Sequence, residues 1–202
     1  MTTPAKRRGR PRAYDPDAAL AAARDCFWQA GYAATSLEDL AADMGMNRPS
    51  IYAAFGDKQA LYRATVERYA RSTGESVDRV LADPHPLRDT LHTLYRGARD
   101  FYLAGEDAPR GCFLIGTAIT EARHDPRVRE ITEATFTGFT RAFTERFERA
   151  ARDGELTDHP PAALAEIATA TLHTLAVRAR TGAPPAALDA IIDAAVDLIC
   201  RP

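Results

Sequence analysis

Residues 35–62, TSLEDLAADMGMNRPSIYAAFGDKQALY, decide the fold of this chain. The stretch predicts a helix that starts at one of its first two residues and stops before Gly45. A second short helix begins at about Asn47, and a third begins at Asp57. Two short helices joined by a glycine turn are typical of a helix-turn-helix, in which the N-terminus of the second helix enters the major groove of DNA. The stretch therefore predicts a DNA-binding domain.

The rest of the chain predicts more helices. Alanine, leucine, arginine and glutamate dominate, and runs of β-branched residues are nearly absent, so we expect an all-α fold of about nine helices. Asp15 followed by Pro16 is a capping residue with proline at the first helical position. Gly31 is expected to end that first helix in the αL conformation. The expected later helices cover about 47–55, 57–81, 87–104, 111–123, 126–152, 161–181 and 186–200.

We expect three segments along the chain. Residues 1–14 form a basic, disordered arm, residues 15–62 form the helix-turn-helix domain, and residues 63–202 form a helical domain for ligand binding and dimerisation. The segment Asp83-Pro84-His85-Pro86 interrupts this second part, because proline cannot continue a helix. No internal repeat is visible.

The charge of the chain is uneven. Residues 1–12 carry five basic residues and no acid, whereas the remainder holds 21 basic and 28 acidic residues. Such a basic arm favours local contact with a polyanion. The arm sequence KRRGRPR (6–12) resembles an AT-hook core, so we expect Arg8, Arg10 and Arg12 to enter a narrow minor groove. The alternative is a solvated tail that only adds non-specific affinity.

Composition argues against several classes of protein. No apolar run reaches about 18 residues and no apolar stretch follows the charged N-terminus, so we expect a cytoplasmic protein without a membrane span or a signal peptide. The three cysteines, Cys26, Cys112 and Cys200, are odd in number and suit reduced thiols. Glu121 and His124 have the spacing of one di-iron half-site, but no second copy exists. With no Walker, Rossmann or Gly-x-Ser-x-Gly pattern, we expect no enzyme, no metal and no cofactor.

Residues 15–62 resemble the N-terminal domain of the TetR family of bacterial transcriptional regulators. The resemblance rests on about 48 residues, whereas the downstream helices agree only in number and length. It implies a homodimer that binds a roughly palindromic operator, and a C-terminal helical domain whose small-molecule ligand releases the DNA. The matching residues are Phe27, Gly31, Tyr32, Thr35, Ser36, Leu37, Leu40, Ala41, Gly45, Asn47, Ile51, Tyr52, Phe55, Lys58, Leu61 and Tyr62.

Chemistry at the predicted helix starts agrees with DNA contact. Arg48 at the tip of the recognition helix can bond guanine in bidentate fashion, and Pro49 can contact a thymine methyl group. Ser50 can bond a phosphate or a base edge, and Tyr52 projects away from the Ile51 side of the helix. The other candidates for phosphate or base contact are Thr35, Ser36, Asn47 and Lys58.

Each of these residues also has a purely structural interpretation. Asn47 is better explained as the N-cap of its helix than as a residue that reads a base. Thr35 and Ser36 would cap their helix without any DNA. Tyr52 can be a packing residue, and Arg48 can be a surface charge without a role.

The C-terminal half predicts an apolar cavity lined by aromatic residues. Arg110 to Thr117 is a very apolar segment with two glycines, as a central buried helix requires. Thr117, His92 and His173 can orient a ligand in such a cavity. The alternative for the aromatic residues is plain core, and Cys112 is either a sensor thiol or an inert buried one. The predicted lining residues are Tyr95, Phe101, Tyr102, Cys112, Phe113, Thr117, Phe136, Phe139, Phe143 and His173.

The last two predicted helices suit a two-fold interface. Small and aliphatic residues form a stripe on each helix, which permits close approach of a second copy. Burial within one chain is the alternative. The stripes are Ala168, Leu172, Leu175 and Ala179, and Leu188, Ile191, Ile192, Ala195 and Ile199.

Together these features predict a homodimeric, ligand-responsive DNA-binding regulator, most simply a repressor with an apolar or aromatic effector. A transcriptional activator is a second possibility, since the position of the operator decides the direction of control. An architectural DNA-binding protein would not need about 120 residues of additional helical domain. A small-molecule carrier would not need the intact recognition helix with Arg48, Tyr52 and Lys58.

Overall fold

The computed structural model describes residues 14–105, 108–156 and 160–201. All regular secondary structure in this part of the chain is helical, and it contains no strand, which confirms the all-α prediction. Its elements are α1 (Pro16–Ala34), α2 (Leu37–Asp43), α3 (Arg48–Phe55), α4 (Lys58–Ala82), α5 (Leu87–Leu103), the π-helical turn η1 (Leu114–Ala118), α6 (Ile119–Glu121), α7 (Pro126–Arg152), α8 (Pro161–Arg180) and α9 (Pro185–Ile199).

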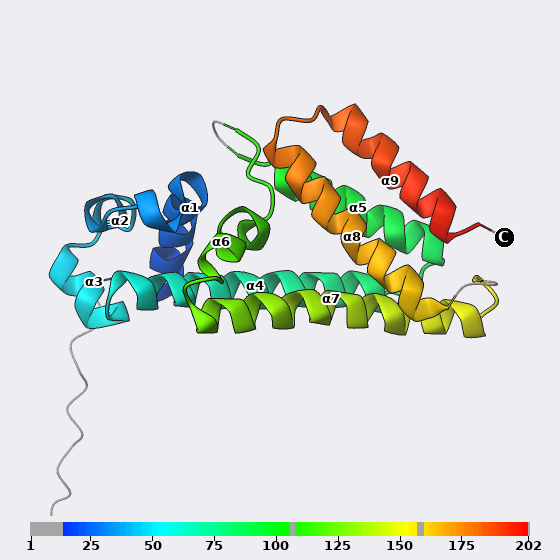
Figure 1. Ribbon diagram of the computed structural model, residues 1–202, viewed down its shortest axis with the longest axis horizontal. Helices are drawn as coiled ribbons and strands as arrows, with labels where there is room; N and C mark the ends of the chain where they lie inside the picture. Colours follow the sequence, from blue (N-terminus) through cyan, green and yellow to red (C-terminus); the bar gives the residue numbers. More distant parts are fainter. Residues whose placement is uncertain (1–13, 106–107, 157–159, 202) are drawn as a thin grey trace, which may run out of the picture.

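The long helices α4 and α7 pack along each other and form the base of the molecule (Figure 1). Helices α1, α2 and α3 gather at one end, around the first turns of α4. Helices α5, α8 and α9 pack together over the other end, and the short η1–α6 segment lies between the two groups. Helix α4 is therefore the element that the two groups share, and it crosses residue 62 without interruption.

The predicted starts and ends agree closely with these helices. Asp15, Asn47 and Asp57 each accept a backbone N–H bond as the N-cap of α1, α3 and α4, so the capping pattern explains where these helices begin. Gly31 has the predicted positive φ, with a value of +79°, but its ψ of 165° lies outside the αL region. The chain becomes helical again after Gly31, and α1 ends at Ala34.

The segment 111–123 differs from the single helix that we expected. Gly111 has a φ of +65° and donates its amide to the Tyr102 carbonyl, so it belongs to the connection that precedes the helix. The turn that follows is π-helical, and α6 is only three residues long. Both positions favour glycine, because a Cβ at 111 would lie 2.8 Å from the Ala176 carbonyl oxygen and a Cβ at 116 would lie 3.1 Å from the Arg180 guanidinium.

One hydrophobic core runs through both groups of helices. Phe27 of α1 packs edge-on against Tyr62 of α4, with ring centroids 4.9 Å apart, and Tyr62 in turn contacts Phe113. Trp28 contacts both Tyr69 and Phe113. These five aromatic residues join the helix-turn-helix to the second domain without an intervening gap.

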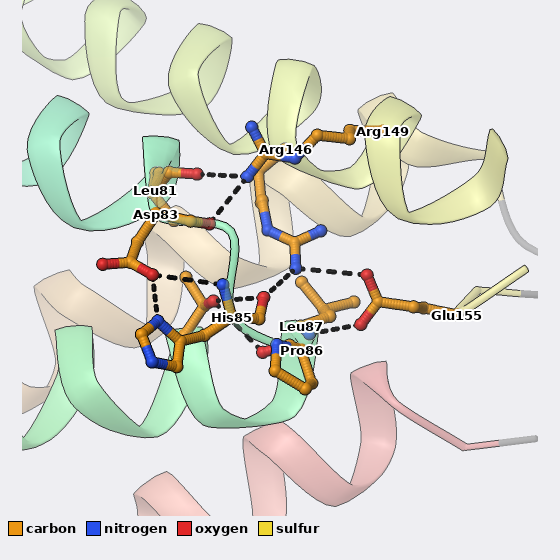
Figure 2. Close-up of polar contacts among 9 residues, drawn as sticks. Leu81, Asp83, His85, Pro86, Leu87, Arg146, Arg149 and Glu155 are labelled. Carbon is orange, nitrogen blue, oxygen red and sulfur yellow. Dashed lines mark hydrogen bonds and ion pairs between the residues drawn. The ribbon is translucent and has the colours of Figure 1, made fainter. Parts of the chain in front are cut away.

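Two arginines of α7 hold the corner between α4 and α5 (Figure 2). The Arg149 Nη2 donates to the carbonyls of Leu81 and Asp83, at 2.8 and 3.1 Å, where α4 ends. The Arg146 Nη2 donates to the His85 carbonyl at 3.0 Å and to Glu155 at 3.3 Å. Because these bonds satisfy carbonyls that the helix end leaves without partners, the far end of α4 is fixed to α7.

The first turns of α4 are fixed to the opposite end of α7. Asp125, the N-cap of α7, is buried and accepts a bond from Arg63 Nε at 2.7 Å and from Gln59 Nε2 at 3.1 Å. Burial alone would raise the pKa of the Asp125 carboxyl. The hydrogen bonds from Arg63 and from the Val128 amide outweigh burial and lower that pKa.

Across the described ranges, none of the helices combines the length and the apolar character that crossing a bilayer requires.

Candidate nucleic-acid interface and ligand cavity

The helix-turn-helix consists of α2, a turn at Gly45 and α3. Gly45 has a φ of +60°, a value that glycine adopts without strain. Leu40 and Ile51 are fully buried and hold the two helices against α1 and α4. The buried side of α3 thus leaves its first turn and its opposite side at the surface.

Four predicted DNA-contacting residues lie on or beside this exposed part of α3. Arg48 and Pro49 are exposed in the first turn, and Ser50 is half-buried. Tyr52 is 50% exposed, on the side of α3 away from the buried Ile51. An arginine, a hydroxyl and an aromatic residue at one helix N-terminus can contact base edges and phosphates together.

Asn47 and Ser36 serve as helix caps. The Asn47 Oδ1 accepts the Ser50 amide at 2.9 Å, as its N-cap interpretation requires. Ser36 and Asp39 form a reciprocal capping box, in which the Asp39 amide donates to Ser36 Oγ at 3.1 Å and the Ser36 amide donates to Asp39 at 2.9 Å. Asn47 remains exposed, whereas the Ser36 hydroxyl also donates to Asp39 at 2.7 Å, so a phosphate contact by Ser36 has to replace a bond to that carboxylate.

Thr35 and Lys58 are placed less favourably. Thr35 is only 2% exposed, and its hydroxyl donates to the Gly31 carbonyl at 2.7 Å. The structure therefore does not present the Thr35 side chain at the surface. The Lys58 Nζ lies 4.5 Å from the centre of the Tyr32 ring, in a cation–π contact beside the start of α4. Arg8, Arg10 and Arg12 lie outside the described residues.

Glu38 is a member of this surface that was not predicted from the sequence. Its carboxylate pairs with the Arg48 guanidinium across the turn, and both side chains are exposed. An acidic residue in the first turn of α2 looks like an ordinary helix-dipole partner, so the pattern alone gave no reason to assign it to Arg48.

Polar contacts tie this domain to the second one. The Tyr62 hydroxyl donates to Thr117 of η1 at 3.2 Å, and the Trp28 indole N–H donates to the Arg110 carbonyl at 2.9 Å. Arg180 at the end of α8 reaches the same Arg110 carbonyl at 2.9 Å. These bonds and the aromatic contacts join α1, α4 and η1 directly.

A cavity of about 450 Å³ lies where α1, α4 and α5 meet. We call it the α1–α4–α5 cavity. Its volume lies within the range of small-molecule sites. Its walls also include one residue from α7 and one from α8. The lining residues are Leu20, Ala21, Arg24, Thr65, Arg68, Tyr69, Ser72, Thr73, Ser76, Val77, Val80, Thr93, Leu94, Gly97, Ala98, Phe101, Tyr102, Phe139 and Leu172.

Three of the ten predicted ligand residues line this cavity, namely Phe101, Tyr102 and Phe139. Tyr95 and Phe143 are buried core, and the Tyr95 hydroxyl donates to the Ala168 carbonyl at 3.1 Å. Cys112, Phe113 and Thr117 are buried at the junction around η1. Phe136 and His173 meet edge to face, with ring centroids 4.6 Å apart, in a shallow depression between α7 and α8. His92 faces Asp193 of α9.

The contributions of α1 and α4 to the cavity were not predicted from the sequence. Arg68, Ser72, Thr73 and Ser76 form a polar stripe that is typical of a solvated helix side. Only the placement of α5 beside this stripe makes it a cavity wall. The sequence of α4 contains no pattern that predicts α5 as its neighbour.

Burial suppresses the reactivity of two groups near the cavity. Burial raises the pKa of the Cys112 thiol, which favours its neutral form. The Cys112 sulfur lies 3.6 Å from the Tyr69 hydroxyl oxygen. Burial also raises the pKa of Tyr102, so its phenol stays protonated and can donate to a ligand that enters the cavity.

The predicted stripe of α8 is buried inside the chain, and so is that of α9 except for Ile191 and Ala195, which are half-buried. Leu172, Leu175, Leu188 and Ile192 are 3% exposed or less, because α8 and α9 pack on each other and on α5. The alternative interpretation, burial within one chain, therefore describes these stripes. The same helices expose other large apolar side chains, namely Ile167, Val177 and Leu198, which we call the α8–α9 surface.

Comparison with protein families finds two matches. Residues 19–65 match the family described as "Bacterial regulatory proteins, tetR family". Residues 89–195 match the family described as "Tetracyclin repressor-like, C-terminal domain". The transcriptional repressor ComR of Escherichia coli is 29% identical to this chain over 180 residues, which cover 88% of this chain and 85% of ComR.

Solved structures give the same result. A cysteine-substituted form of the TetR family regulator CifR, in complex with a 26-bp operator DNA, is 34% identical and superimposes with a TM-score of 0.81. The match covers 93% of this chain and 98% of that chain. The reduced form of E. coli NemR superimposes with a TM-score of 0.79 over 92% of this chain and 98% of NemR, and at 17% identity it shows a shared fold.

Proposed function

Because the chain belongs to the TetR family of bacterial transcriptional regulators, we propose that it is a repressor that leaves its operator when a small molecule binds. That it is a DNA-binding transcriptional regulator follows from the family. The observation that supports operator binding is the exposed tip of α3, where the side chains of Arg48, Pro49 and Tyr52 lie at the surface.

In this proposal α3 enters the major groove, and Arg48 reads a base there. A guanine offers two acceptors that match the guanidinium, and a good bidentate pair contributes about 1–3 kcal/mol of discrimination. Ser36, Ser50, Tyr52 and Lys58 would contact the phosphates on either side. Asn47 would mainly hold the N-terminus of α3 in shape through its bond to the Ser50 amide. The arginines of the arm would add contacts in the neighbouring minor groove.

The proposal requires a dimer, because a palindromic operator presents two half-sites about 34–36 Å apart. The α8–α9 surface supports this requirement. Val177 and Leu198 are 46% and 50% exposed, and α9, which carries Leu198, is the outermost helix of its group (Figure 1). A second copy would bury these side chains in a four-helix interface.

The effector would bind in the α1–α4–α5 cavity. Helix α4 contributes eight of the nineteen lining residues, more than any other helix, and also carries Lys58 and Tyr62 at its start. A ligand that fits the cavity only after α4 shifts would favour the state that does not bind DNA. Such a ligand must bind that state more tightly, or it changes nothing.

The experiment that tests the repressor is selection of genomic DNA fragments with the purified protein at near-physiological salt. We expect enrichment of one or a few palindromes. Smooth enrichment of AT-rich DNA without a palindrome would contradict a specific repressor and support an architectural role.

The test of base reading is Arg48→Ala. This variant should weaken binding to the selected palindrome by roughly tenfold to a hundredfold while non-specific binding changes little. Arg71→Ala is a matched control, because Arg71 is an exposed arginine of α4 outside the helix-turn-helix. Unchanged operator affinity of Arg48→Ala would show that Arg48 does not read a base.

A further inference from the structure

The charged residues that line the α1–α4–α5 cavity all carry a positive charge. Its two charged lining residues, Arg24 and Arg68, are both cationic. Its inner wall is apolar and buried, and includes Val77, Leu94 and Leu172. The exposed lining residues are polar or lie near the mouth, namely Ser72, Ser76, Thr93, Gly97 and Phe101. The cavity therefore combines an apolar interior with a positively charged mouth.

The aspartates that pair with these two arginines lie outside the cavity. Arg68 pairs with Asp17, in the first turn of α1. Asp25 accepts from Arg24 at 2.8 Å and also from Arg110 at 3.1 Å, and Arg110 does not line the cavity. Arg24 therefore shares its carboxylate with a second guanidinium, whereas Arg68 has Asp17 as its partner. Neither aspartate lines the cavity.

The Arg68–Asp17 pair is the one that a ligand can replace. Both side chains are more than two-fifths exposed, and an exposed ion pair contributes little to stability. A carboxylate that is attached to an apolar body gains the burial of that body in addition to the contact with Arg68. It can therefore compete with Asp17, which brings only its charge.

We propose that the α1–α4–α5 cavity binds an amphipathic carboxylate, whose apolar body fills the space between α4 and α5 and whose carboxylate takes Arg68 from Asp17. This inference rests on the proposed function and names the chemical class of its effector. The exchange removes a direct contact between α1 and α4. Because α1 belongs to the DNA-binding domain, the ligand acts on the contact between that domain and α4.

The test uses the full chain and pairs of probes that differ in charge, octanoate with 1-octanol and decanoate with 1-decanol. Trp28 is the only tryptophan of the chain. Its ring centre lies 5.3 Å from that of Tyr69 and 5.9 Å from that of Phe101, both of which line the cavity. Quenching or a shift of Trp28 emission therefore reports occupancy without DNA.

We expect at least one carboxylate to bind about tenfold more tightly than its alcohol. Arg68→Gln should weaken carboxylate binding about tenfold and leave alcohol binding unchanged. Asp17→Asn should strengthen carboxylate binding several-fold, because it removes the internal competitor. Arg71→Gln on the same helix does not alter the cavity wall and should change neither affinity.

Three outcomes would overturn the inference. They are equal affinity for carboxylate and alcohol, equal loss of both in Arg68→Gln, and no binding of either carboxylate. Binding of the selected operator by the ligand-free protein is measured separately. If operator binding persists while the carboxylates fail to bind, the inference is wrong and the proposed repressor stands. If no operator is bound, the proposed function is wrong whatever the cavity binds.

Discussion

Asp125 is the residue through which the DNA-proximal end of α4 is held by the second domain. It caps α7 through the amides of Arg127 and Val128, at 3.0 and 3.3 Å, and accepts the Arg63 guanidinium at 2.7 Å. Asparagine caps a helix nearly as well as aspartate, so Asp125→Asn removes the charge and keeps the cap. We expect this variant to lose about 1–2 kcal/mol of unfolding free energy at pH 7, measured by urea titration.

The loss should depend on pH in a defined direction. The pKa of Asp125 is lowered in the folded protein, so its carboxylate contributes stability at pH values above the ordinary pKa of aspartate. That contribution falls as the pH drops below about 4, and the difference between the two proteins should then shrink. Asp57→Asn is the matched control, because Asp57 caps α4 without an arginine partner. A difference that stays constant down to about pH 2 would contradict this account.

Cys112 gives a second prediction at this scale. Burial raises the pKa of Cys26, to about 12, and also raises that of Cys112. Burial raises the pKa of Cys200 as well, but this thiol is only half-buried and is the one that a reagent can reach. At about pH 8 a thiol reagent should therefore label Cys200 first and reach Cys26 and Cys112 only after unfolding. Mass spectrometry of labelled peptides measures the order, and Cys200→Ser should abolish the early reaction. Rapid labelling of Cys112 in the native protein would support the sensor interpretation instead.

Among the elements, the connection into η1 makes the strictest demand on its sequence. Gly111 has a φ of +65°, and a Cβ at this position would lie 2.8 Å from the Ala176 carbonyl oxygen of α8. We expect Gly111→Ala to cost about 2 kcal/mol or more, since both the backbone conformation and the contact become unfavourable. Thermal and urea unfolding measure this cost.

Gly138→Ala provides the contrast within the same protein. Gly138 lies inside α7 without a positive φ, and a Cβ added there would have no neighbouring atom within 4 Å. Alanine favours a helix interior over glycine by about 0.5–1 kcal/mol, so this variant should be neutral or slightly stabilised. Equal destabilisation by the two substitutions would show that the space around Gly111 is not the cause.

Helix limits could be predicted from the sequence because local chemistry sets them. Asp15, Asn47 and Asp57 cap their helices, and Pro126 and Pro161 occupy first helical positions, as expected. Contacts between elements could not be predicted in the same way. Arg68 and Ser76 have the pattern of a solvated side, and they line a cavity only because α5 lies beside them. Three of the seven predicted aromatic residues, Tyr95, Phe113 and Phe143, are core for the same reason, since the neighbouring helices fill the space around them.

At the scale of the whole molecule, the α8–α9 surface decides whether two copies assemble. Val177→Glu and Leu198→Glu place a charge where the proposed interface would be dry. Each should weaken dimerisation by roughly 30-fold or more, and operator affinity should fall with it. Sedimentation over a range of concentrations measures the first effect. Ile119→Glu is a matched control, because Ile119 is equally exposed but belongs to α6.

The result that would contradict this interface is a dimer of unchanged strength in both variants. A dimer that fails in Ile119→Glu but not in Val177→Glu would move the interface to the η1–α6 side. Loss of operator binding by a variant that remains dimeric would separate DNA affinity from assembly.

Release of the near anchor of α4 at Asp125 would turn this helix into a lever about its far anchor at Arg149. Arg149 holds its far end, and its 25 residues span roughly 37 Å at about 1.5 Å per residue. A tilt of about 5° around that far pivot moves the near end by about 3 Å, and in the proposed dimer two such shifts add against a spacing of about 34–36 Å. Such a tilt must break the Arg63–Asp125 contact and move the buried Tyr62, and it is large enough to take one recognition helix out of register with its groove.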